Sequence, residues 1–290
     1  MRGGLTHILP PFIVAVLAGT GFLMTGGCGS VDVNPFLDSE RYFTIYGSFD
    51  MDFLVQHLRV VPINQDIGSI DSTIDAAVTA TDLSDGQTWT WRDSVFTFTD
   101  GSTGHVFTSR FRIQAGRTYR IEVTRSDGAV TWVETTVPDQ PHAIMGEADI
   151  SSPPDQAFPT GTQKIIWTGL TTEPHRVDVS YRFVQQDDMP FIDLDIPYDT
   201  KSSSEDMSKG WEITVHYTAD YAFLKREYIR TNPWHFVGAL MRVQVLAADW
   251  VPPGGVWDRD VLSQPGTLSN VHNGFGYVGS SGRFSVEWIP

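Results

Sequence analysis

The chain has 290 residues, enough for about two domains, and its apolar content is that of a globular protein rather than a disordered one. Its formal net charge of −15 argues against a nucleic-acid partner, because phosphate binding requires a basic surface. The single cysteine excludes a disulfide framework and a cysteine-rich zinc site.

Residues 1–27 have the features of an export signal. Arg2 and the terminal amine give a short positive region, an apolar stretch follows at residues 8–18, and small residues precede Cys28. Pro10, Pro11 and two glycines interrupt the apolar part, which is shorter than the roughly 20 residues that a spanning helix needs. We therefore expect a signal peptide rather than a membrane span.

The position of the cysteine points to the type of signal. Thr25-Gly26-Gly27-Cys28 resembles the lipobox of bacterial lipoproteins, although Thr25 stands where that family usually has an aliphatic residue. The resemblance implies that Cys28 accepts a diacylglycerol and becomes residue one after cleavage. Residues 28–38 would then be a lipidated flexible leash. The alternative is ordinary secretion with an incidental free cysteine.

Residues 39–138 alternate apolar and polar side chains with a period of two, which predicts β-strands. Asp-Gly pairs at residues 85–86, 100–101 and 127–128 each lie between strand-like runs and predict hairpin turns. The clearest strand is 118–125, with its partner at 130–137. We expect an antiparallel β-sandwich without a helix of three turns.

Trp89 and Trp91 lie two residues apart and so share one face of a strand. They could form a platform on which a sugar stacks, or they could face the core. The polar neighbours Thr88, Thr90 and Arg92 look solvated, which favours the core.

Residues 139–290 follow a proline-containing linker at 138–141 and predict a second β-sandwich. The expected strands are 164–168, 176–183, 211–217, 240–246 and 283–288. A short helix is expected near 220–230, with Thr218 or Asp220 as its cap, and Asn232-Pro233 ends it. The fold class is thus all-β, with two tandem sandwiches of immunoglobulin- or transthyretin-like type.

An acidic insertion spans residues 185–210 and has seven acidic residues against two lysines. Its carboxylates could supply oxygen ligands to a structural calcium ion, but their order lacks the EF-hand spacing. The alternative is a solvated loop, and no other cofactor is expected. The candidate ligands are Asp187, Asp188, Asp193 and Asp195.

A second irregular stretch at residues 249–260 contains two tryptophans with flanking charges. These side chains could stack on and hydrogen-bond a ring-shaped ligand, or the tryptophans could plug the end of the sandwich. The candidate ligand-binding residues are Trp250, Trp257, Asp258, Arg259 and Asp260.

The run from Gly274 to Gly279 matches G-x-G-x-x-G, but only eleven residues follow it and they read as a strand. The nucleotide interpretation is therefore rejected, and the glycines are expected to permit a bulge or a close backbone crossing. Metalloprotease, P-loop and serine-hydrolase motifs are absent from the sequence. Paired carboxylates can always be found in so acidic a chain, so they are no evidence for an enzyme.

Several segments together resemble an uncharacterised family of outer-membrane lipoproteins that accompanies TonB-dependent, starch-utilisation-type uptake systems. The family has no established activity, so the resemblance implies an accessory role at the outer membrane and no catalytic residues. The segments are the Cys28 lipobox, Tyr42–Gly47, Gly116–Val123, Thr136–Pro138 and Ser269–Gly279.

Three functions follow in order of preference. The first is a non-enzymatic, lipid-anchored accessory or ligand-binding component of an outer-membrane uptake assembly, with a TonB-dependent transporter or another envelope protein as partner. The second is a structural or adhesive envelope protein that binds another protein through its sheets. The third is a hydrolase on a sandwich scaffold.

Overall fold

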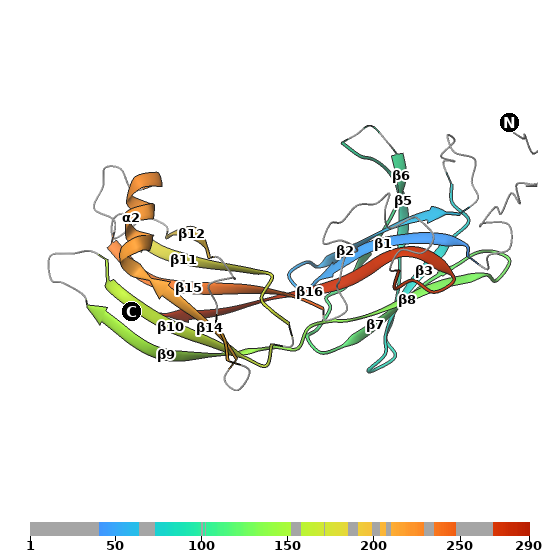
Figure 1. Cartoon of the computed structure of the whole chain (residues 1–290). Helices are drawn as coiled ribbons and strands as arrows, with labels where there is room; N and C mark the ends of the chain where they lie inside the picture. Colours follow the sequence, from blue (N-terminus) through green and yellow to red (C-terminus); the bar gives the residue numbers. More distant parts are fainter. Residues whose placement is uncertain are drawn as a thin grey trace, which may run out of the picture. The chain divides into compact units, whose positions relative to one another are not determined.

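The computed structural model describes residues 41–63, 73–99, 101, 103–151, 158–170, 172–184, 191–198, 204–206, 210–228, 235–247 and 269–290. These ranges consist of strands, connecting turns and one helix, α2 (Tyr217–Glu227). They form two β-sandwiches (Figure 1). The predicted all-β fold class is confirmed.

The first sandwich has its core between two sheets. One is the β16-β1-β2-β6-β5 part of an eight-stranded sheet of order β12-β11-β15-β16-β1-β2-β6-β5, which we call the larger sheet. The other is a four-stranded sheet of order β4-β3-β7-β8. The bounds of its strands are β1 (Phe43–Asp50), β2 (Val55–Pro62), β3 (Ala77–Asp82), β4 (Thr88–Thr90), β5 (Arg92–Thr97), β6 (Thr103–Arg110), β7 (Thr118–Thr124), β8 (Val130–Thr136) and β16 (Gly274–Trp288).

The glycines of the three Asp-Gly pairs lie between β3 and β4, β5 and β6, and β7 and β8, and the two strands in each case are antiparallel. Gly86, Gly101 and Gly128 have φ values of 74°, 81° and 88°, the left-handed region that favours glycine. In β7, alternate side chains from Tyr119 to Val123 are buried. The predicted hairpins and this strand are confirmed.

The two tryptophans of the first sandwich pack with its core. Trp91 is 9% exposed, and Trp89 stacks on Phe111 with ring centroids 4.5 Å apart. The chain leaves one sheet after β4 and enters the other at β5, so Trp91 lies where it crosses between the sheets. The core interpretation is confirmed.

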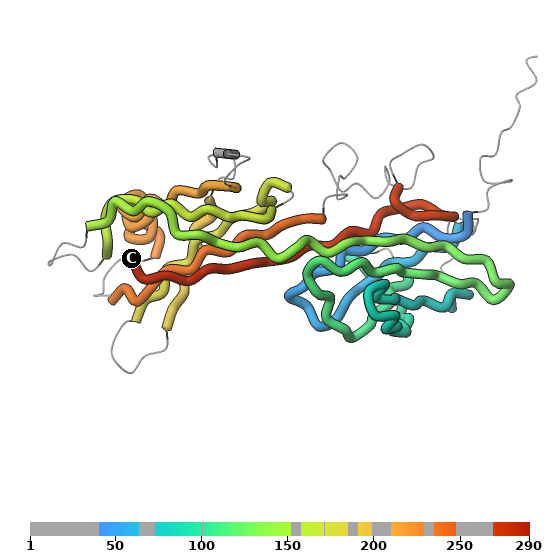
Figure 2. The backbone as a smooth tube through the Cα atoms, turned by 90° about the horizontal axis from the view of Figure 1, so that it is seen from below, coloured from blue at the N-terminus to red at the C-terminus, as the bar shows by residue number. Residues whose placement is uncertain are grey.

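The second sandwich packs the β12-β11-β15-β16 part of the larger sheet against a sheet of order β13-β14-β10-β9. Figure 2 follows the chain from β8 into β9 through the predicted linker. Helix α2 follows β14 directly. The strand bounds are β9 (His142–Ser151), β10 (Thr160–Thr168), β11 (Arg176–Val184), β12 (Ile192–Tyr198), β13 (Ser204–Asp206), β14 (Gly210–His216) and β15 (His235–Leu246).

Strand β16 takes part in both sandwiches (Figure 1). Its first half pairs in parallel with β1, and its second half pairs antiparallel with β15. Val278 therefore lies in the first core, whereas Phe284 and Trp288 lie in the second. The first sandwich thus draws one strand from the C-terminal end of the chain.

Glycines allow β16 to approach β1 closely. A Cβ atom at Gly274 would lie 2.3 Å from the carbonyl oxygen of Phe43, and one at Gly276 would lie 2.1 Å from that of Ile45. Gly276 also has φ 102°. The expected close backbone approach is confirmed at these two positions.

Two local predictions are wrong. The acidic insertion is not only a solvated loop, because β12 and β13 lie within it and β12 pairs with β11 over seven residue pairs. Helix α2 begins at Tyr217 after the cap position His216, which makes no side-chain capping bond. Because the chain passes from β14 straight into the helix, Thr218 and Asp220 lie inside its first turn.

Candidate functional site

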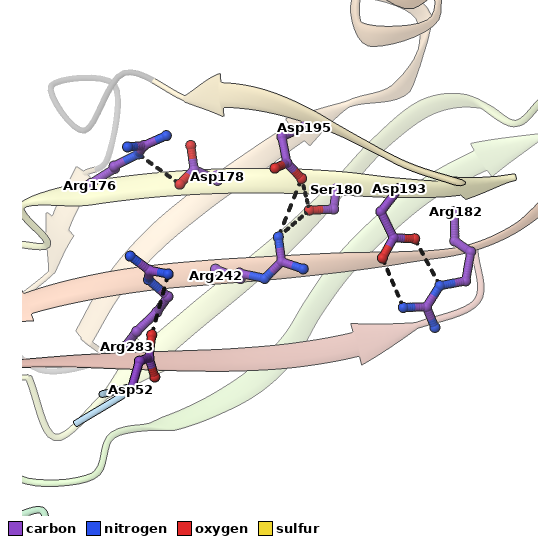
Figure 3. A network of polar contacts seen from close by, with 9 residues as sticks. All are labelled: Asp52, Arg176, Asp178, Ser180, Arg182, Asp193, Asp195, Arg242 and Arg283. Atoms are coloured by element: carbon purple, nitrogen blue, oxygen red, sulfur yellow. Dashed lines mark hydrogen bonds and ion pairs between the residues drawn. The ribbon is translucent and has the colours of Figure 1, made fainter. Parts of the chain in front are cut away.

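The strands β12, β11, β15 and β16 carry charged side chains on the face of their sheet that is turned away from the core (Figure 3). Because side chains alternate along a strand, the apolar residues of β11 face the core and the intervening polar ones face outward. We call this set the charged face; it comprises Arg176, Asp178, Ser180, Arg182, Asp193, Asp195, Arg242 and Arg283, with Asp52 beside it.

Arg182 and Asp193 form a bidentate ion pair at one end of the charged face. They are opposite each other in the β11–β12 register. The guanidinium Nε and Nη2 donate to the two carboxylate oxygens at 2.8 and 3.0 Å. Hydrogen bonding to Arg182 lowers the pKa of Asp193, and the same bond raises the pKa of Arg182.

The neighbouring polar group is centred on Ser180. The Nη1 of Arg242 lies 2.6 Å from the hydroxyl of Ser180 and 3.3 Å from Oδ1 of Asp195. The Ser180 hydroxyl itself donates to Asp195. This arrangement gives Asp195 both a cation and a hydroxyl donor.

Two more ion pairs extend the charged face (Figure 3). Arg176 Nε lies 2.8 Å from Oδ2 of Asp178, and Arg283 Nη1 lies 3.3 Å from Oδ2 of Asp52. Each arginine of the charged face therefore has an aspartate partner.

These pairs bear on the predicted calcium ligands. Asp193 and Asp195 come together on the charged face, but each already contacts an arginine. Asp187 and Asp188 lie outside the described residues. Within the described ranges, no group of three or more His, Cys, Asp or Glu side chains is placed to hold a metal ion. The calcium site stays a prediction.

A hollow of about 360 Å³ adjoins the Arg182–Asp193 pair. Its walls are largely apolar, and three charged residues line it, Arg182, Asp193 and Glu287. We call it the Gly238 pocket; its lining residues are Ser180, Arg182, Asp193, Val237, Gly238, Ala239, Leu240, Glu287, Trp288 and Ile289.

The pocket exists because residue 238 lacks a side chain. Gly238 is opposite Arg182 in the β11–β15 register, and the next outward residue along β15 is Leu240, opposite both Ser180 and Glu287. A Cβ atom at position 238 would come no closer than 3.4 Å to a neighbour, the Trp288 carbonyl oxygen. The backbone there does not require glycine, so its effect is to leave the hollow open.

A second polar cluster lies inside the sandwich. Asp220 of α2 is 6% exposed and accepts hydrogen bonds from the hydroxyls of Tyr181 and Tyr198. Burial raises the pKa of Asp220. Tyr217 accepts a 2.7 Å bond from the Trp288 indole. These contacts attach α2 to the sheets, and their burial indicates a structural role.

The remaining predicted site residues are outside the part of the chain that the structure describes. They are the lipidation residue Cys28 and the candidate ligand-binding residues Trp250, Trp257, Asp258, Arg259 and Asp260. Within the described ranges, no helix combines the length and the apolar content that a membrane crossing requires.

Comparison with protein-family models and with curated proteins finds no match. Among solved structures, a cytokine receptor complex matches 70% of this chain and 84% of its own at 9% identity and a TM-score of 0.22. A segment of two fibronectin type-III domains from chicken tenascin matches 86% of this chain and 98% of its own at 12% identity and a TM-score of 0.21. These scores are too low to support a conclusion about function.

The Gly238 pocket was missed by reasoning from the sequence. The available signal was a glycine inside an otherwise β-branched and apolar strand pattern, which often marks a bulge or a close approach to a ligand. Its partners Arg182 and Glu287 are more than 100 residues apart in the chain. Only the strand order brings them to one place.

Proposed function

We propose that this chain is a non-enzymatic lipoprotein of the outer membrane, anchored through Cys28, that serves as an accessory binding component of a nutrient-uptake assembly. The binding surface is the Gly238 pocket together with the adjoining charged face. The anchor and the uptake role rest on the lipobox and on the family resemblance.

The observation that carries the binding role is the chemistry of the pocket. Its walls are largely apolar and its polar groups are few, the usual composition of a ligand site. The carboxylates of Asp193 and Asp195 are hydrogen-bonded to cationic or hydroxyl donors. Carboxylates fixed in this way are suited to recognising the polar groups of a bound molecule.

The test uses the full lipidated chain purified from detergent-solubilised membranes. Gly238→Val fills the pocket with a residue that suits a strand, and Ala77→Val is its control at an exposed position of the first sandwich. We expect a TonB-dependent transporter to co-purify with the wild-type and Ala77→Val chains and to be lost from Gly238→Val. Equal retention by both variants would reject the pocket as the contact.

A second candidate function, adhesion to another envelope protein, is favoured by the edge strands. Ile144 and Met145 on β9 are 52% and 42% exposed, and Val95 and Phe96 on β5 are 50% and 53% exposed. Both strands end a sheet, so their outer backbone groups could pair with an added strand. Under this function, Met145→Lys would abolish retention of an envelope protein other than a transporter, while Gly238→Val would not.

A further inference from the structure

We infer that the Gly238 pocket binds an organic cation, an ammonium or guanidinium group carried on a short apolar body. This inference deepens the proposed function, on which it rests, by naming the chemistry of the ligand.

The size of the pocket limits the occupant. Its volume of about 360 Å³ lies near the lower end of the range of about 300–1,000 Å³ for ligand sites. Leu240 and Ile289 contribute apolar surface, and the backbone at Gly238 lies beside them. A short aliphatic chain or a single ring would bury its surface there.

The charges at the rim determine the sign of the ligand. Arg182 and Asp193 neutralise each other through their two hydrogen bonds. Glu287 is the other charged lining residue. Its carboxylate acts on Arg182 through space, but no ion pair within 4.0 Å and no hydrogen bond of its side chain is found among the described residues. The pocket therefore keeps one net negative charge.

The existing hydrogen bonds of Arg182 support the same conclusion. Arg182 already uses its Nε and Nη2 on Asp193, so an anionic ligand would have to compete with that carboxylate. A cation would instead meet the exposed Glu287 carboxylate without breaking an existing pair. The acidic chain as a whole, at −15, also attracts cations.

The experiment measures binding of matched probes to the full chain by titration calorimetry and saturation-transfer NMR. The probes are n-hexylammonium, n-hexanol and hexanoate, which share one aliphatic body and differ in charge. We expect n-hexylammonium to bind most tightly, with an affinity that falls as salt is added. Equal or tighter binding of hexanoate would overturn the inference.

Two variants locate the site. Glu287→Gln removes the charge and keeps the shape, so it should weaken n-hexylammonium binding by up to about fivefold, the upper end of the range for an exposed ion pair. Glu134→Gln on β8 is the matched control and should change nothing. Gly238→Val should abolish binding of n-hexanol as well. An unchanged affinity in Glu287→Gln, with thermal unfolding like that of the wild type, would contradict the inference.

A further binding measurement with peptides distinguishes two sources of the ammonium group, a lysine side chain of a partner protein and a free amine. N-acetyl-Gly-Lys-Gly-amide presents the ammonium group on a protein-like backbone, and the norleucine peptide is its uncharged control. Preference for the lysine peptide over n-hexylammonium would assign the pocket to a partner's side chain, and the reverse order would assign it to a free amine; both outcomes support a cation site.

The outcome for the ligand class is separable from the outcome for the proposed function. If Gly238→Val loses the transporter while no ammonium probe binds the wild type, the ligand class fails and the binding function stands. If n-hexylammonium binds but the Gly238→Val chain retains the transporter, the cation site stands and the transporter contact lies elsewhere.

Discussion

Asp220 is a carboxyl group enclosed by the second sandwich, where it accepts hydrogen bonds from Tyr181 and Tyr198. Burial raises its pKa, while both tyrosine bonds and the nearby His216 lower it without cancelling the effect. The folded chain therefore holds the Asp220 proton more tightly than the unfolded chain does. The stability due to this proton is complete below the unfolded pKa and is lost as the pH rises through the folded one.

We predict that Asp220→Asn removes this loss. From about pH 4 upward, the free energy of unfolding of the wild type should decrease relative to that of the variant. The slope should be at most about 1.4 kcal/mol per pH unit, the value for one proton. Urea unfolding between pH 4 and pH 8 measures the difference.

The control for this titration is Asp149→Asn, which changes an exposed carboxylate on β9. Its stability should run parallel to that of the wild type over the same range. If the free energies of unfolding of the wild type and Asp220→Asn differ by the same amount at every pH, the pKa of Asp220 is the same in the folded and unfolded chains, which contradicts the prediction.

At the scale of the elements, the pairing of β16 with β1 depends on glycine at position 276. Alanine there would have to hold φ near 102° and would place its Cβ 2.1 Å from the Ile45 carbonyl oxygen. We predict that Gly276→Ala lowers the free energy of unfolding by about 1–3 kcal/mol. Chemical denaturation measures it.

Gly238→Ala on the neighbouring β15 is the matched control, because a Cβ fits there at 3.4 Å. It should leave stability unchanged or raise it slightly, since alanine reduces the freedom of the unfolded chain. Similar losses of free energy of unfolding in both variants would mean that the close approach to β1 is not the reason why position 276 requires glycine.

The elements that could be predicted from the sequence are those fixed by local chemistry. Strand β7 and the Asp-Gly turns are encoded by neighbours in the sequence, and local chemistry was sufficient for them. Strand β12 is not predicted because IDLDIPY places aspartates on the outer face of an edge strand, where an arginine of β11 and one of β15 pair with them. An acidic edge strand and a solvated acidic loop look alike until those arginines are placed.

For the whole molecule, the shared strand makes the first sandwich dependent on residues far along the chain. Val278 of β16 is fully buried in the first core, and β1 pairs with eight residues of that strand. We predict that a fragment of residues 39–138 does not fold, because it lacks this strand and leaves the edge of β1 open. Circular dichroism and urea titration of the fragment test this.

A second fragment provides the control for the first. Residues 269–282 appended to 39–138 through a flexible linker long enough to restore the parallel pairing should recover a cooperative transition. A cooperative transition in the shorter fragment would show that β16 is dispensable for the first sandwich.

The proposed anchor also concerns the whole molecule. We predict that Cys28→Ser releases the chain from the membrane fraction and abolishes labelling by radioactive palmitate, because no other acylation site is expected. Fractionation and labelling of cells that express each form measure both effects. Membrane retention of an unlabelled Cys28→Ser chain would remove the basis for a lipoprotein.

The candidate site was the least predictable part of the chain. The sequence directed attention to tryptophans and acidic runs, whose side chains are chemically conspicuous. The Gly238 pocket instead arises from an absent side chain and from four strands that the topology brings together, β12, β11, β15 and β16. Such a hollow depends on long-range register, which local patterns do not specify.

The placement of β16 also has a consequence for biosynthesis. A ribosome makes the first eight strands early, yet their sandwich stays incomplete until about residue 281 has been added. Until then the leading half lacks the strand that completes its sheet. We therefore expect the two sandwiches to fold together, once the C-terminal strand has been made.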